Sequence, residues 1–152
     1  MNKNIRIKFQ LLYIISLIIL IDQISKYWIK KNLIYIINKN MIFFSFNFVQ
    51  NDGAAFNILS GNRLILSSIS LISSIVLIYI IFIKDNIKIK TKLSLSFILA
   101  GSIGNGIDRF FRGFVIDFID LNFIDFPIFN IADISINIGF IILLINYLKQ
   151  KE

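Results

Sequence analysis

The 152-residue chain contains no cysteine, no histidine, one proline and one tryptophan. Without cysteine it has no disulfide and no thiol nucleophile. Without histidine it lacks a Ser-His-Asp triad, and without both residues it lacks the usual zinc sites. The side chains left for chemistry are carboxylates, lysine and serine.

Charged residues are also scarce, at 16%, whereas 57% of the residues are hydrophobic and the mean hydropathy is +0.78. This composition is too apolar for an ordinary soluble core, so we expect an integral membrane protein. The length suits one domain, and we expect residues 1–152 to form a single membrane domain. The basic start and the apolar run 9–21 are similar to a signal peptide, but no small-residue cleavage site follows. We therefore interpret this run as an uncleaved first span.

Four segments suit helices that cross a hydrocarbon core, which needs about 20 residues. They are residues 9–29, 64–83, 93–111 and 131–148. An even number of spans places both termini on one side of the membrane. The two termini and the loop 84–92 carry nine basic residues against two acidic ones, whereas the charges on the other side balance. The positive-inside rule therefore predicts cytoplasmic termini.

The first exported loop, at about 35–60, contains a strand pattern. Phe44, Phe46 and Phe48 alternate with polar residues, and the Asn-Asp-Gly sequence at 51–53 has turn chemistry. An interfacial belt of aromatic residues is the alternative for the phenylalanines alone. We predict an all-α membrane protein of four transmembrane helices with a small β-sheet in the exported loop. The small residues that follow the turn favour a segment that lies beside an extended peptide.

Three predicted spans carry an acid at their exported ends, namely Asp22, Asp108 and Asp133. Ionisable groups at membrane depth are costly, and they usually mark a functional site that faces the bundle interior. Asp22 and Lys26 are four residues apart on the first helix, so an interfacial ion pair is the simplest interpretation of these two.

The third and fourth predicted helices each have a polar stripe with spacings of three and four residues. The stripes are Ser102, Asn105, Asp108 and Arg109 on the third helix, and Asn130, Asp133 and Asn137 on the fourth. Neither stripe tolerates lipid, so we expect the two to face each other. Glycines at 101, 104 and 106 allow close approach to a neighbouring helix. We expect Arg109 to tie the third helix to the exported loop.

Asp117 lies in a short apolar segment near the interface, whereas Asp120 and Asp125 have polar neighbours and are expected to be solvated. Two carboxylates in one site, without histidine or cysteine, suit aspartic-protease chemistry. One carboxylate takes a proton from water, and the other, protonated, polarises the scissile carbonyl, because like charges separate their apparent pKa values. Asn105 and Asn130 would hold the carboxylates or the oxyanion by hydrogen bonds.

Five short motifs are spread over nearly the whole chain. They are DQISK at 22–26, NDGAAF at 51–56, GNGIDR at 104–109, VIDF at 115–118 and FNIAD at 129–133. Their order and spacing closely resemble the lipoprotein signal peptidases (signal peptidase II) of bacteria. Five ordered motifs are a specific signal, whereas any one alone would be weak. The departures are mild: the family more often has Val where Ile116 stands, and Asp52 and Gly106 occupy variable positions.

The resemblance implies an intramembrane aspartic endopeptidase with Asp117 and Asp133 as its catalytic dyad. Such an enzyme removes signal peptides from diacylglyceryl-modified prolipoproteins by cutting just before the lipidated cysteine. Supporting or substrate-binding roles then fall to Asp22, Lys26, Asn51, Gly53, Asn105, Asp108, Arg109 and Asn130.

The resemblance also implies a multi-pass protein of the bacterial inner membrane, with its active site near the periplasmic face. A globomycin-type cyclic peptide is expected to bind between the two aspartates. We expect a monomer in contact with membrane lipid, with no cofactor, no metal and no nucleic-acid partner.

Three alternatives use the same residues differently. A small transporter or channel subunit would use the carboxylates as a proton or cation path, but it would place acids near the midplane or at both ends of the bundle. A Mg²⁺-dependent lipid phosphotransferase would use them as metal ligands and would be stopped by EDTA. A Ser/Lys protease would use Lys26, although no serine is set apart by a special turn.

The charge asymmetry gives a topological prediction. In Lys39→Cys, an impermeant thiol reagent should label the cysteine without breaching the inner membrane, whereas labelling of Lys88→Cys should require a breach. The chain has no other cysteine, so each variant reports a single site. The reverse labelling pattern would overturn the orientation and move the site to the cytoplasmic side.

Overall fold

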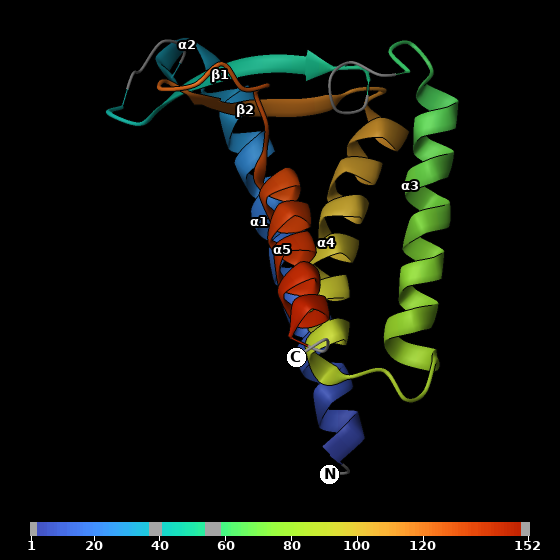
Figure 1. Cartoon of the computed structure of the whole chain (residues 1–152). Helices are drawn as coiled ribbons and strands as arrows, with labels where there is room; N and C mark the ends of the chain where they lie inside the picture. Colours follow the sequence, from blue (N-terminus) through green and yellow to red (C-terminus); the bar gives the residue numbers. More distant parts are fainter. Residues whose placement is uncertain (1–2, 37–40, 54–58, 150–152) are drawn as a thin grey trace.

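The computed structural model describes residues 3–36, 41–53 and 59–149. In chain order the elements are α1 (Lys3–Lys31), α2 (Leu33–Ile36), β1 (Phe44–Asn51), α3 (Arg63–Ile78), the π-helical segment η2 (Tyr79–Ile83), α4 (Ile89–Phe111), β2 (Val115–Leu121) and α5 (Ile131–Leu148). The long helices lie beneath the two-stranded sheet, and α1 begins and α5 ends at the opposite end of the bundle (Figure 1). The prediction of a mostly helical protein with a small sheet is confirmed.

Three helices in the described part of the chain are long and apolar enough to cross a membrane: Lys3–Lys31, Arg63–Ile83 and Ile131–Leu148. Only 17% of the most apolar stretch of each is buried inside the protein, so most of its side chains face outward. Outward-facing apolar helices are typical of membrane spans. The helix α4 has 23 residues but also carries Asn105, Asp108 and Arg109, and it is not among the three.

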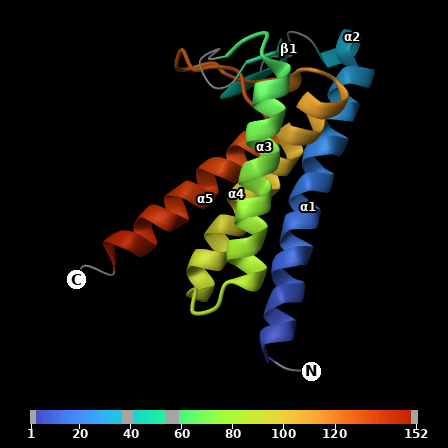
Figure 2. The same cartoon turned by 90° about the vertical axis from the view of Figure 1, so that its right-hand side faces the viewer.

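The helix α4 occupies the centre of the bundle and packs against α1, α3 and α5 (Figure 2). A Cβ on Gly101 would lie 2.3 Å from the carbonyl oxygen of Ala132 in α5, and one on Gly104 would lie 2.8 Å from Oδ2 of Asp22 in α1. Gly106 faces α3 with more room, 3.2 Å from the nearest atom. The sequence therefore correctly predicted close helix approach at 101 and 104.

Two apolar clusters enclose a polar layer inside the bundle. The larger cluster joins α1, η2 and α4 and consists of Leu11, Ile15, Ile81, Leu99 and Ala100. The smaller cluster lies against the sheet and consists of Ile29, Ile116 and Phe118. Along α1, the buried residues Asp22 and Lys26 fall between the two clusters. Apolar side chains therefore cover the polar layer at both ends.

The sheet pairs two distant segments, because β1 runs antiparallel to β2, with Phe44 opposite Leu121 and Asn51 opposite Val115. The alternating phenylalanines correctly predicted the strand β1. The expectation that the sheet lies within the exported loop was wrong, since its second strand comes from the segment between α4 and α5. Residues 115–118 are buried at four successive positions, so β2 lacks the alternation that reveals a half-buried strand.

Gly101→Ala should lower the thermal stability, although alanine normally favours a helix over glycine by about 1 kcal/mol. The added methyl group overlaps the Ala132 carbonyl and forces α4 away from α5, at a cost of about 1–3 kcal/mol. Gly106→Ala is the matched control, because its Cβ would meet only the side chain of Ser70, at 3.2 Å or more. Thermal unfolding in detergent measures both variants. A Tm for Gly101→Ala at or above that of Gly106→Ala contradicts the tight α4–α5 contact.

Candidate active site

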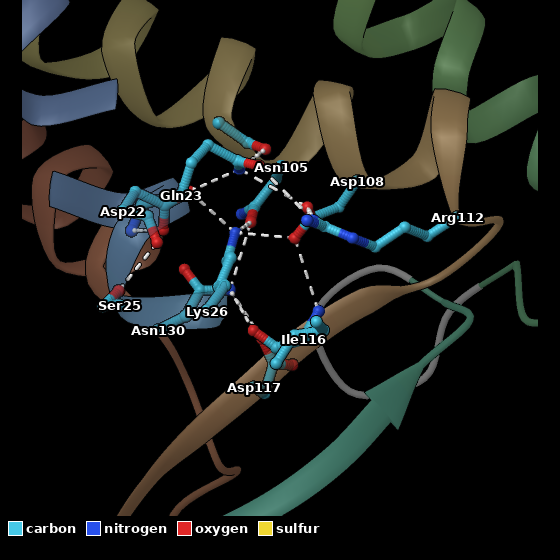
Figure 3. Close-up of polar contacts among 12 residues, drawn as sticks. Asp22, Gln23, Ser25, Lys26, Asn105, Asp108, Arg112, Ile116, Asp117 and Asn130 are labelled. Atoms are coloured by element: carbon cyan, nitrogen blue, oxygen red, sulfur yellow. Dashed lines mark hydrogen bonds and ion pairs between the residues drawn. The ribbon is translucent and has the colours of Figure 1, made fainter. Parts of the chain in front are cut away.

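Lys26 lies at the centre of the polar layer with a fully buried side chain. Its Nζ is 2.9 Å from Oδ2 of Asp22, 2.9 Å from Oδ2 of Asp108 and 3.0 Å from Oδ1 of Asn105 (Figure 3). Two of these contacts, with Asp22 and Asn105, are hydrogen bonds, and the contact with Asp108 is a second ion pair. The pair expected at an interface is therefore buried inside the bundle, and it joins α1 to α4.

Asp22 extends this network to the start of α5. Its Oδ1 accepts a hydrogen bond of 2.9 Å from the backbone N–H of Ala132, while its Oδ2 binds Lys26. The first backbone N–H groups of a helix lack partners within the helix and form the positive end of its dipole. A carboxylate of α1 thus caps α5 and fixes where α5 begins.

Asn130 is the N-cap residue of α5 and contacts both Asp117 and Asp133. Its Oδ1 accepts from the Asp133 backbone N–H at 3.0 Å, and Asp133 Oδ2 accepts from the Asn130 backbone N–H at 3.0 Å, which together form a capping box. Its Nδ2 donates to Asp117 Oδ1 at 2.6 Å and to Asn105 Oδ1 at 3.1 Å. One asparagine therefore binds both aspartates.

The strand β2 brings Asp117 to this position. Phe129, which precedes the N-cap, forms an antiparallel bridge with Ile119. On the side of α4, the backbone N–H of Ile116 donates to Oδ2 of Asp108 at 3.4 Å. The strand is thus held by the start of α5 and by the end of α4.

The carboxylate of Asp117 is nearly inaccessible, with 2% of the residue exposed. Besides the bond from Asn130, its Oδ2 accepts from Nδ2 of Asn51 at 2.8 Å. Burial raises the pKa of Asp117 from its ordinary value of 3.8 to about 6, and the nearby Asp133 also raises it, whereas the two amide hydrogen bonds and Lys26 lower it. Such a raised pKa beside a second carboxylate is typical of acid–base sites.

Asp133 is half-buried, and its Oδ1 accepts a hydrogen bond of 2.8 Å from Nδ2 of Asn105. The Oδ1 of Asn105 in turn accepts from Lys26 and Asn130. The polar residues Asn105 of α4 and Asn130 of α5 therefore do face each other, with Asp133 held by both.

The loop after β1 is attached to the same site. The backbone N–H of Gly53 donates to Oδ1 of Asn51 at 3.0 Å, and the Nη2 of Arg109 donates to the carbonyl oxygen of Gly53 at 3.0 Å. As expected from the sequence, Arg109 ties α4 to this loop. Positions 54–56 of the second motif lie outside the described residues.

Some predicted polar residues lie away from this cluster. The Oγ of Ser102 is 3.0 Å from that of Ser73 in α3, and the side chain of Asn137 is exposed. Spacings of three and four cover a broad arc of a helix, so the sequence alone does not tell which neighbour each residue faces. Asp125 is exposed, as expected, whereas Asp120 is half-buried and accepts a 2.7 Å hydrogen bond from an asparagine of β1.

Two further residues, Gln23 and Arg112, contact the polar layer, although no sequence pattern predicted a role for either. The Nε2 of Gln23 donates to Oδ2 of Asp22 at 3.0 Å and to the carbonyl oxygen of Gly104 at 3.1 Å. Arg112 forms an ion pair with Oδ1 of Asp108. The spacing of four residues from Asp108 to Arg112 is the signal that could have revealed this pair.

Comparison with solved structures first gives the class of protein. The fold is similar to that of a chain described as a bacterial membrane enzyme, with a TM-score of 0.85 and 38% sequence identity. The similarity covers 94% of this chain and 90% of that one. The chain therefore shares its fold with a bacterial membrane enzyme.

Sequence comparison then gives the family. Residues 14–149 match the profile of the family described as Signal peptidase (SPase) II, peptidase family A8. A lipoprotein signal peptidase of Clostridium tetani is 41% identical over 145 residues, which cover 90% of this chain and 91% of the relative. One from Nostoc punctiforme is 40% identical over 145 residues, which cover 92% and 90%. The chain belongs to the signal peptidase II family and is an aspartic-class peptidase, which confirms the resemblance drawn from the five motifs.

Asp117→Asn should change how stability depends on pH. Because the folded-state pKa of Asp117 is raised, its contribution to stability is fully present below 3.8 and is lost as the pH rises through about 6. A neutral amide does not pay this penalty. The stability of the variant relative to the parent should therefore increase between about pH 4 and 7, by at most about 3 kcal/mol.

Thermal unfolding in detergent over this pH range measures the difference, with the exposed Asp125→Asn as control. A Tm difference between Asp117→Asn and the parent that does not vary with pH would rule out the raised pKa of Asp117.

Proposed function

We propose that this chain is an intramembrane endopeptidase that removes signal peptides from diacylglyceryl-modified prolipoproteins, with Asp117 and Asp133 as its catalytic dyad. The bond cut is the one before the lipidated cysteine. The observation that carries the proposal is the bridge through Asn130, whose side chain binds Asp117 and whose backbone N–H binds Asp133. The name shared by the two relatives, lipoprotein signal peptidase, supports the substrate class.

The dyad holds one proton, because two like charges in a water-poor site repel strongly. The ionised carboxylate takes a proton from water as the water oxygen attacks the scissile carbonyl carbon, and the protonated carboxyl gives its proton to the carbonyl oxygen. When the tetrahedral diol collapses, the C–N bond breaks and the amine takes the proton from the first carboxyl. The second carboxylate recovers its proton from the diol, so the dyad returns to its starting state.

Three asparagines keep the carboxylates oriented for these transfers. Asn51 and Asn130 donate to the two oxygens of Asp117, and Asn105 donates to Asp133. Amide donors stabilise a carboxylate without competing for its proton. Arg109 attracts both aspartates electrostatically and holds the Gly53 carbonyl, so it places the loop beside the dyad, where an extended peptide would pass.

The proposal includes a four-span topology with cytoplasmic termini and the dyad near the periplasmic face. The basic segments 3–8, 84–92 and 149–151 support this orientation, as α1 begins and α5 ends opposite the sheet (Figure 1). Asn105 and Asp108 of α4 are turned toward α1 and α5, which lowers the cost of placing α4 in the membrane. A lipidated cysteine anchors the scissile bond at the membrane surface, at the depth of the dyad. We expect a monomeric enzyme, inhibited by a globomycin-type cyclic peptide between the two aspartates.

Asp117→Asn and Asp133→Asn should each lose at least about 10² to 10⁴-fold in turnover, because an amide keeps the shape but exchanges no proton. The double variant should be scarcely worse than either single variant, since the two carboxyls act as a unit. Asp120→Asn and Asp125→Asn are matched controls that should stay near the parental rate. The measurement is cleavage of a diacylglyceryl-modified prolipoprotein by each purified variant, with membrane levels of each checked.

The same assay with EDTA tests whether cleavage needs a metal ion. The parental rate should be unchanged by EDTA, because the proposed mechanism uses only the two carboxyl groups. Robust activity in Asp117→Asn or Asp133→Asn would contradict the proposed dyad, as would equal losses of cleavage rate in Asp120→Asn and Asp125→Asn. Inhibition by EDTA would revive the metal-dependent alternative.

A further inference from the structure

Arg112 lies outside all five motifs, yet it contacts the network that surrounds the dyad. It follows the last residue of α4, and its Nη1 binds Oδ1 of the fully buried Asp108. Gln23 of α1 accepts a second, longer hydrogen bond of 3.4 Å from the same Nη1 (Figure 3). The Arg112 side chain is 28% exposed, so a partly solvated cation closes a buried cluster.

The two carboxylate oxygens of Asp108 bind different partners. Oδ1 binds Arg112, whereas Oδ2 binds Lys26 at 2.9 Å and the backbone N–H of Ile116 at 3.4 Å. Ile116 immediately precedes Asp117, so the orientation of the Asp108 carboxylate helps to set the position of Asp117. Without Arg112, Oδ1 loses its charged partner and keeps only the long 3.4 Å hydrogen bond from Nε2 of Gln23, so the carboxylate is held less firmly against the pull of Lys26.

Arg112 also balances the charge of the buried cluster. Asp22, Asp108, Lys26 and Arg112 form a cluster with no net charge, and loss of Arg112 leaves one uncompensated negative charge. Asp117 lies next to this cluster, facing Asp133 of α5, Lys26 of α1 and the neutral Asn51 of β1. Two further charged groups lie at this end of α4. Arg109 interacts with both aspartates, and the guanidinium of Arg63 in α3 binds the carbonyls of Arg109 and Phe110.

We propose that Arg112 is a positioning residue for peptide cleavage: it acts through Asp108 to hold β2 in place and supplies the positive charge that balances the buried cluster beside the dyad. The inference rests on the dyad proposed above. Arg112 touches neither aspartate of the dyad in this account, and its effect reaches them through Asp108 and through the local field.

The pH profile of kcat/KM for a lipid-modified prolipoprotein tests this role. Arg112→Gln removes a positive charge, so both dyad carboxyls ionise less readily, and both limbs of the profile should move upward by roughly half a pH unit. The rate at the optimum should also fall about 10-fold, because the strand loses its fixed position. Arg112→Lys keeps the positive charge, so the limbs of its pH profile should stay at the parental pH.

The double variant Asp108→Asn/Arg112→Gln again has a cluster of zero net charge. The acidic and basic limbs of its pH profile should return to the parental pH. Its loss of rate at the optimum should be less than the product of the losses of the two single variants, since the effects of contacting residues are not additive. Arg63→Gln is the charge-matched control at the same end of α4 and should leave the limbs in place. Tm values of the purified variants separate loss of folding from loss of rate.

Unshifted limbs in folded Arg112→Gln overturn the inference, as does an equal shift in Arg63→Gln. If Arg112→Gln does not insert, the double variant decides: parental limbs support the proposal and shifted limbs refute it. The proposal of the dyad is tested separately: if it is wrong, Asp117→Asn remains active, whatever the result for the Arg112 variants.

Discussion

The buried ammonium group of Lys26 is the interaction on which the rest of the site depends. Burying an unpaired charge is strongly unfavourable, and Lys26 avoids this only because it pairs with Asp22 and Asp108 and donates a hydrogen bond to Asn105. Removing one partner of such a group typically costs about 3–5 kcal/mol, so α1 and α4 have one favourable arrangement at this level. Asp22 then fixes the start of α5, and Asp108 fixes β2.

The same arrangement explains why two carboxylates can be kept close together. Amides from three different elements, β1, α4 and α5, donate to Asp117 and Asp133, while apolar clusters above and below keep water out. This environment raises the pKa of Asp117, which costs stability at neutral pH. In the proposed mechanism the raised pKa prepares the group for proton transfer, so stability is given up for function at this site.

Much of this was predictable from local sequence patterns. The helices follow from apolar length, the strand β1 from the alternation at 44–48, and the close contacts of α4 from glycines at 101 and 104. The carboxylates of the spans could be recognised because charge inside a membrane is rare. Pairing of β1 with β2 was not predictable, because it joins segments about 70 residues apart and β2 has no alternation. The roles of Gln23 and Arg112 also depend on side-chain directions that spacing leaves open, as the exposure of Asn137 illustrates.

The central claim is that Asp117 and Asp133 are coupled through a shared proton, and infrared spectroscopy tests it most directly. The carbonyl stretch of a protonated carboxyl lies at higher frequency than the bands of a carboxylate, so it can be titrated in the purified protein. We predict such a band in the parent, with a titration midpoint near the Asp117 pKa of about 6. In Asp133→Asn the titration midpoint should fall, because a like charge that raises the pKa of Asp117 is gone. A midpoint in Asp133→Asn that stays at the parental value would contradict the account.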